Sequence, residues 1–170
     1  MSFNSYYLYI IILFGLLLLY SYYEFLTNVN SMEIFWGAIK GNLRKFYMIS
    51  LVVIICAFIL LLFYLIKTNS LTEIEGFKIF IGLFGITIFS LFWLPLSLLY
   101  VNYNMNKSLI KFLVIITLFL VAFSAFYFLT VFKDVKDNSL YKKIVFYGMV
   151  YLFCHVFFLD FIFWDYFFFK

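Results

Sequence analysis

Five long apolar segments occupy most of this 170-residue chain, and its few charged residues lie mainly between them. The segments run over residues 6–23, 46–66, 79–100, 112–132 and 144–164. A helix needs roughly 20 residues to cross a hydrocarbon core about 30 Å thick, and each segment is close to that length. Because backbone polar groups in lipid must bond within the protein, such segments are expected to be helices. The sequence predicts an all-α, polytopic transmembrane bundle with five spans.

Composition agrees with this class and excludes a soluble domain. Hydrophobic residues make up 68% of the chain and charged residues 12%, whereas soluble domains are about a quarter charged. The loops are too short to fold alone, so we expect one transmembrane domain over residues 1–170. The net charge is +4. The basic residues lie beside span ends, where contact with anionic lipid headgroups accounts for them. No basic patch with groove-reading geometry is present, so we expect membrane lipids and no nucleic acid as partners.

The segment between the first two spans has the pattern of a helix that lies in the membrane interface. Ser31 is a plausible N-cap, and Gly41 followed by Asn42 is a plausible break before the second span. Apolar side chains recur at helical spacing at Met32, Phe35, Trp36, Ile39, Leu43 and Phe46. Charged side chains fall on the opposite side, and Trp36 would lie at headgroup depth. We expect a short interfacial amphipathic helix here, with a solvated elbow as the alternative.

Asp160 is the most informative single residue, because it is a carboxylate inside the fifth apolar segment. Such a group costs about 2.5–3.5 kcal/mol at the centre of a spanning helix, so it normally faces the bundle and has a partner. The fifth span ends on the side where the second begins. We therefore expect Asp160 to lie within reach of Arg44, or of the hydroxyl of Tyr47.

The third span ends on the same side and adds further polar or kinked features at that depth. The resulting candidate polar cluster consists of Arg44, Tyr47, Ser50, Trp93, Ser97, Asp160 and Trp164. Two interpretations stay open. The cluster is either a structural clamp between helices or a site for a ligand, an ion or a proton.

His155 is the one histidine of the sequence, and it lies inside the same span as Asp160. At 100° per residue the two positions are about 140° apart, so an α-helix would not place them on one face. We expect a buried histidine that is hydrogen-bonded to a hydroxyl of Tyr or Ser. A proton relay is the alternative, since histidine titrates near neutrality.

Three other residues have structural interpretations. Cys56 and Cys154 fall near the middle of their spans, and we expect both to be small apolar packing residues. Pro95 lies inside the third span and leaves the carbonyl of Leu91 without its helical donor. Nearby serines, at positions 90 and 97, could help to satisfy the local backbone.

No motif specific to a reaction or a cofactor is found. The sequence lacks HExxH, CxxC, a Gly-rich phosphate loop and a Ser, His, Asp arrangement recognisable by order. One histidine and two cysteines are too few for a zinc or iron–sulfur site. We therefore expect no cofactor, no metal and no enzymatic activity.

Three short strings resemble a family of small, uncharacterised multi-span membrane proteins of algae, other protists and large DNA viruses. The matching residues are Trp36, Ile39, Arg44, Tyr47 and Ser50 in the first, Trp93, Pro95, Leu96 and Ser97 in the second, and Leu159, Asp160 and Trp164 in the third. The resemblance implies no known activity.

The sequence thus favours a non-catalytic integral membrane protein, a structural or accessory subunit of a larger membrane assembly. Its expected partners are other membrane subunits or a second copy of itself. The alternative is a small transporter, channel or lipid-binding protein that uses the polar cluster around Asp160. The bias toward Phe, Ile, Tyr, Lys and Asn suggests an AT-rich genome, which points to an organelle or viral membrane.

Overall fold

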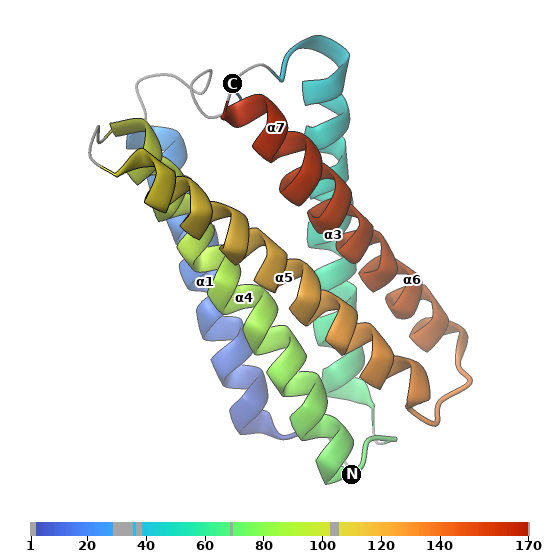
Figure 1. Cartoon of the computed structure of the whole chain (residues 1–170). Coiled ribbons are helices and arrows are strands. Elements are labelled where there is room, and N and C mark those ends of the chain that lie inside the picture. Colours follow the sequence, from blue (N-terminus) through green and yellow to red (C-terminus); the bar gives the residue numbers. More distant parts are fainter. Residues whose placement is uncertain (1–2, 29–35, 37–38, 69, 103–105, 170) are drawn as a thin grey trace.

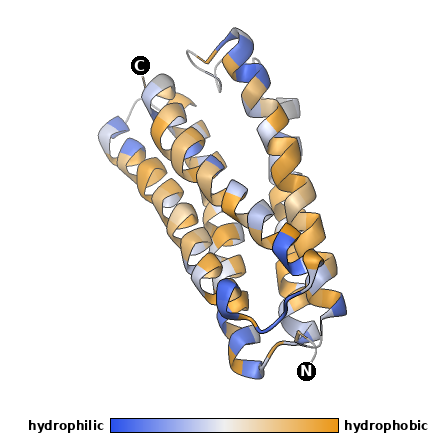
Figure 2. Cartoon of the chain, turned by 90° about the vertical axis from the view of Figure 1, so that its right-hand side faces the viewer, coloured by the Kyte–Doolittle hydropathy of each residue, from blue (hydrophilic) through white to orange (hydrophobic). Residues whose placement is uncertain are grey.

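The structure, a computed structural model, describes residues 3–28, 36, 39–68, 70–102 and 106–169. Its helices are α1 (Ser5–Asn28), α3 (Gly41–Lys67), α4 (Glu73–Asn102), α5 (Lys107–Asp134), α6 (Leu140–Cys154), the π-helix η1 (His155–Trp164) and α7 (Asp165–Phe168) (Figure 1). Five helical stretches, with α6 and η1 counted together, are long and apolar enough to cross a membrane. The predicted five-span helical bundle is confirmed, and polar residues gather toward its ends (Figure 2).

Local capping chemistry explains where two of the helices begin. At the start of α4 the backbone N–H of Thr72 donates to the Glu75 carboxylate at 2.8 Å. In return the N–H of Glu75 donates to the Thr72 hydroxyl at 3.2 Å, which forms a reciprocal capping box. At the start of α6 the hydroxyl of Ser139 accepts from the N–H of Lys142 at 3.1 Å. These bonds satisfy donors that a helix terminus would otherwise leave unpaired.

The bundle has α5 at its centre. In its most apolar stretch half of the residues of α5 are buried, against 6% for α1. Helix α4 packs along α5, and α1 packs on the far side of α4 (Figure 1). Helix α3 packs against α6, and both α6 and η1 also contact α5. The molecule therefore consists of an α1–α4–α5 layer and an α3–α6–η1 pair joined through α5.

Close backbone contact holds α4 against α5. A Cβ atom built on Gly82 would lie 2.9 Å from Cβ of Phe128 and 3.0 Å from its Cα. A Cβ on Gly85 would collide with the side chain of Ser124. Small residues that let helices approach closely are the usual means of association in lipid. The two glycines therefore set how near the helices come.

The interior of the described part of the chain contains two apolar clusters. One of them, here termed the aromatic core, lies at the end of the bundle where α3 begins. Its buried residues are Trp36, Ile39, Tyr47, Trp93, Leu94, Val114, Leu118 and Trp164. It brings residues of α3, α4, α5 and η1 together, and it adjoins the polar side chains described below.

Several details differ from the sequence expectations or lie outside them. The predicted interfacial helix falls largely on residues 29–35 and 37–38, outside the described part. Helix α3 begins at Gly41, before the predicted boundary at Phe46, and Gly41 has a φ of 60°, a left-handed conformation that glycine adopts without strain. Cys56 is exposed on α3 and does not pack inside the bundle, and Cys154 is half-buried.

Pro95 lies inside α4, which continues without a break to Asn102. The hydroxyl of Ser97 donates to the carbonyl of Trp93 at 2.8 Å, and Ser97 is buried. The serine thus bonds a different carbonyl from that of Leu91, which proline leaves without its helical donor. Its bond follows the ordinary pattern in which a helical serine reaches back one turn.

Candidate functional site

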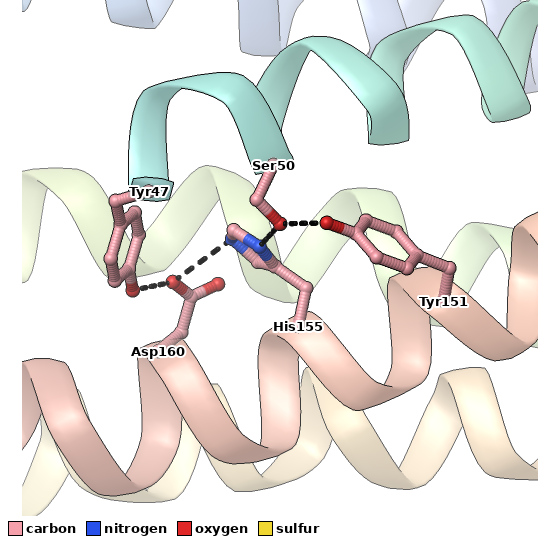
Figure 3. A network of polar contacts seen from close by, with 5 residues as sticks. All are labelled: Tyr47, Ser50, Tyr151, His155 and Asp160. Atoms are coloured by element: carbon pink, nitrogen blue, oxygen red, sulfur yellow. Dashed lines mark hydrogen bonds and ion pairs between the residues drawn. The ribbon is translucent and has the colours of Figure 1, made fainter. Parts of the chain in front are cut away.

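Five polar side chains form a continuous network between α3 and the last span (Figure 3). The Ser50 hydroxyl oxygen lies 2.7 Å from the Tyr151 hydroxyl and 2.6 Å from Nδ1 of His155. Nε2 of His155 faces Oδ1 of Asp160 at 3.4 Å. The same Oδ1 accepts a hydrogen bond from the hydroxyl of Tyr47. Tyr47 and Ser50 come from α3, and the other three residues come from α6 and η1.

The π-helix is what brings His155 and Asp160 together. A π-helix closes its hydrogen bonds between residues i and i+5, so residues five apart come to lie near each other along its surface. His155 and Asp160 have this spacing and are both in η1. The expectation that they would not share a face assumed α-helical geometry and is wrong. Ten residues of π-helix exceed the single turn that is usual, and single-turn π-bulges are frequent at functional sites.

The network is buried. Ser50 is 1% exposed, and Tyr47 and His155 are each 3% exposed. The side chain of Asp160 is 13% exposed, so it is the member with the most access to the outside among these four. Each polar group in such a place must find a partner, because water is not there to replace it. The expected hydroxyl partner of His155 is confirmed, since Ser50 fills that role.

One assignment of protons fits the contacts of the network. Tyr151 donates to the Ser50 oxygen, and Ser50 donates to Nδ1 of His155. The imidazole then carries its proton on Nε2, which points at the carboxylate of Asp160. Tyr47 supplies a second donor to the same carboxylate oxygen. The donors of Tyr151, Ser50 and His155 then follow one direction toward Asp160, and Tyr47 donates to the same carboxylate separately.

Aromatic rings flank the carboxylate end of the network. The Tyr47 ring meets the His155 ring edge-on at 5.1 Å and the Trp36 ring at 5.4 Å. The guanidinium of Arg44 lies over the Trp36 ring, 5.3 Å from its centroid. Of the two partners expected for Asp160, the structure contains the contact with Tyr47. Within the described residues the basic side chain that faces this carboxylate is His155 rather than Arg44.

The remaining members of the predicted cluster lie at the same end of the bundle but outside the network. Trp93 and Trp164 are buried in the aromatic core and meet edge-on at 5.1 Å. The hydroxyl of Ser97 is bonded within its own helix. Trp93 and Trp164 thus lie beside Tyr47 in the aromatic core, and Ser97 is buried on the same helix as Trp93.

Sequence reasoning missed Tyr151 as a member and Asp160 as a neighbour of His155. Tyr151 precedes His155 by four residues, which is the spacing of neighbours on a helix face, so that link was readable. The link to Asp160 was not readable at α-helical spacing. Motif order also gives no sign that Ser50, His155 and Asp160 meet in space. Such triads are recognised by geometry and roles rather than by sequence position.

No family model, curated protein or solved structure matches this chain significantly. The arrangement itself defines what it can do chemically. It contains one imidazole, one carboxylate and three hydroxyl groups, joined at the depth of a spanning helix. Within the described residues no three His, Cys, Asp or Glu side chains are grouped closely enough to hold a metal ion.

Proposed function

We propose that this chain is a structural or accessory subunit of a larger membrane assembly, and that α1 is its docking helix. The observation that carries the proposal is a stripe of exposed side chains along α1. The stripe consists of Tyr6, Tyr9, Leu13, Leu16, Tyr20 and Tyr23, each between 56% and 70% exposed. Its members are spaced alternately three and four residues apart, which is the spacing of a helix–helix seam.

The other face of α1 is already occupied. Ile11 is fully buried, and the rings of Tyr7 and Phe14 contact those of Phe80 and Phe84 on α4. The stripe therefore points away from the bundle. Lipid can cover leucine, but a phenol also gains from a polar partner, and Tyr9 is 70% exposed. A second apolar helix with small or polar residues at the seam fits this surface. We place the assembly in the expected organelle or viral membrane.

The test is extraction of the whole chain from its native membrane in a gentle detergent, followed by native mass spectrometry. A double variant, Leu13→Trp with Leu16→Trp, should release the partner subunit, because bulky rings block the seam. The matched control places tryptophan at Ile55, which is 48% exposed on α3, and should retain the partner. A discrete monomer or simple homodimer in the wild type, or equal behaviour of both variants, would contradict the subunit role.

A second candidate function is binding of a lipid or solute around Asp160. The observation that favours it is the polar network buried inside the spans. A path through the whole membrane fits this structure less well, because helices α3 and α6 are in close contact beyond Tyr151. A Cβ on Gly148 would lie 2.8 Å from Cβ of Ala57. The network is therefore better suited to a site open to one side than to conduction.

Reconstitution into proteoliposomes tests this second function. Binding should appear as a wild-type signal that Asp160→Asn reduces, measured with labelled lipids and with a panel of ions and small solutes. Flux equal to that of empty liposomes together with no Asp160-dependent binding would remove it.

A further inference from the structure

We propose that Ser50 is an activated nucleophile, with His155 as its base and Asp160 as the group that orients the base. This goes beyond the subunit role, which requires no chemistry. The substrate class we infer is the carboxylic ester of a membrane lipid.

The nucleophile and base are within hydrogen-bond distance. The Ser50 oxygen and Nδ1 of His155 are 2.6 Å apart, and both residues are at least 97% buried. A serine hydroxyl is a weak nucleophile unless an adjacent base takes its proton. His155 is placed to do so. The nitrogen that accepts the serine proton here is Nδ1, whereas in chymotrypsin it is Nε2. The serine is still the nucleophile and the histidine is still the base.

Asp160 is the third group, and it orients the imidazole of His155. Nε2 of His155 is buried, makes no hydrogen bond within the described part of the chain and faces Oδ1 of Asp160 at 3.4 Å. That distance is a few tenths of an ångström beyond an ordinary bond, and such contacts are often long before substrate binds. The carboxylate is held in turn by Tyr47. It therefore favours the tautomer with the proton on Nε2, which leaves Nδ1 free to accept from Ser50.

Tyr151 supplies a donor on the other side of the nucleophile. Its hydroxyl is 2.7 Å from the Ser50 oxygen. When the serine oxygen bonds to a carbonyl carbon, the carbonyl oxygen becomes negative and needs a donor nearby. The Tyr151 hydroxyl is the group that can turn toward that oxygen. One donor is fewer than many hydrolases use, which predicts slow turnover.

The step balances with water as the co-reactant. The Ser50 oxygen forms a bond to the ester carbonyl carbon while its proton moves to Nδ1 of His155. The bond from that carbon to the alcohol oxygen then breaks, and the imidazolium returns the proton to the leaving alcohol. Water next attacks the carbonyl carbon of the acyl-serine and gives a proton to His155. The bond from that carbon to the Ser50 oxygen breaks, the imidazolium returns the proton to that oxygen, and the fatty acid leaves. No oxidant or reductant is needed.

Position in the membrane argues for a lipid ester. Ser50 lies nine residues after the start of α3, or about 14 Å along it at 1.5 Å per residue. That places it inside one leaflet rather than at the midplane of a helix about 40 Å long. Its neighbours Ile49 and Val53 are exposed apolar side chains of α3, a surface suited to contact with lipid. Ser50 itself is closed off, so an ester reaches it only when α3 and the π-helix part.

The test is covalent labelling of the whole chain in phosphatidylcholine nanodiscs with an alkyl fluorophosphonate carrying an alkyne. Intact mass and peptide mapping should find one adduct, on Ser50, formed by loss of fluoride. Ser50→Ala should lose it. His155→Gln should slow its formation by at least about 100-fold, the usual contribution of a general base. Ser124→Ala is the matched control, a buried serine on α5, and should label at the wild-type rate.

Folding of each variant is verified separately by its unfolding midpoint in SDS, so that a lost adduct is not a lost fold. Failure of folded wild type to label on Ser50, beside a membrane serine hydrolase that labels in the same nanodiscs, would overturn the proposal. So would equal labelling of Ser50 and Ser124, or labelling that His155→Gln leaves unchanged. Labelling without release of fatty acid from the nanodisc lipid would overturn the assignment of lipid esters.

Discussion

The α4–α5 interface and the α3–η1 interface solve the same problem in opposite ways. Along α4, Gly82 and Gly85 let the backbone approach Phe128 and Ser124 until no space for a Cβ remains. Between α3 and η1, hydrogen-bonded polar side chains span the gap. The first interface is held by close packing of small residues and the second by directional bonds.

The difference follows from lipid as a solvent. Lipid tails are as apolar as leucine, so burial of apolar side chains does not by itself drive helices together. Close packing of small residues requires no particular polar atoms, so it sets only the distance between the two helices. Hydrogen bonds require particular atoms to meet, and therefore set which residues face each other. A polar interface also carries ionisable groups, so it is the one of the two at which chemistry can occur.

The largest effect should come from removing the carboxylate of the polar interface. Asp160→Leu leaves the Tyr47 hydroxyl buried without its acceptor, at about 1–3 kcal/mol, and also removes the carboxylate that Nε2 of His155 faces. Asp160→Asn keeps an acceptor and should cost about 1 kcal/mol. Titration with SDS, followed by tryptophan fluorescence, measures the free energy of unfolding. Equal losses for the two variants would mean that the network does not form.

The close-packed interface should respond next. Gly82→Ala forces a Cβ against the backbone of Phe128, and overpacking of this kind costs about 1–3 kcal/mol. The control is Gly15→Ala in α1, where a Cβ would meet nothing within 4 Å. That change should leave stability equal or slightly higher, since alanine favours helix over glycine. The same SDS titration compares them, and a neutral Gly82→Ala would refute the close contact.

These two interfaces also differ in how far the sequence predicted them. Gly82 and Gly85 fall three residues apart in an apolar segment, and small residues at such spacing mark a packing face. Hydropathy likewise revealed all five spans, because helix length and apolar content are properties of the sequence alone. The glycine face of α4 is therefore readable from the residues, whereas its partners on α5 are known only from the structure.

The polar interface was only partly readable. Topology brought Tyr47 near Asp160, because the second span begins where the fifth ends. The contact of His155 with Asp160 depends on π-helical hydrogen bonding, which hydropathy does not encode. Arg44 was expected on the carboxylate because an ion pair is the obvious partner. An aromatic ring also attracts a guanidinium, and here Trp36 lies beneath it.

A smaller effect should come from the far end of the network. Tyr151→Phe removes the donor to Ser50 but leaves the bond from Ser50 to His155 intact. Hydrogen bonds between spanning helices average about 0.6 kcal/mol, with a maximum near 1.7 kcal/mol. Tyr147, 69% exposed on the same helix, provides the matched control, and Tyr147→Phe should change nothing. If the two variants unfold alike, the Tyr151 hydroxyl has no structural role.

The smallest effect should arise in the loop between α5 and α6, outside the spans. The backbone N–H of Ser139 donates to the Asp137 carboxylate at 2.8 Å, and the hydroxyl of Tyr64 does so as well. Both bonds favour the charged form and hold the pKa of Asp137 below its ordinary value of 3.8. A lowered folded-state pKa gives stability that is present above about pH 4 and is lost as the pH falls through the folded value.

Because Asp137 is largely in contact with water, solvent screening should limit this contribution to less than about 1 kcal/mol. Asp137→Asn should therefore be slightly less stable than wild type at about pH 6, with the two converging below about pH 3. Unfolding free energies in a non-ionic detergent series across that range measure the difference. A gap that widened toward acid would reverse the sign and show that protonated Asp137, not its carboxylate, is the form that the loop stabilises.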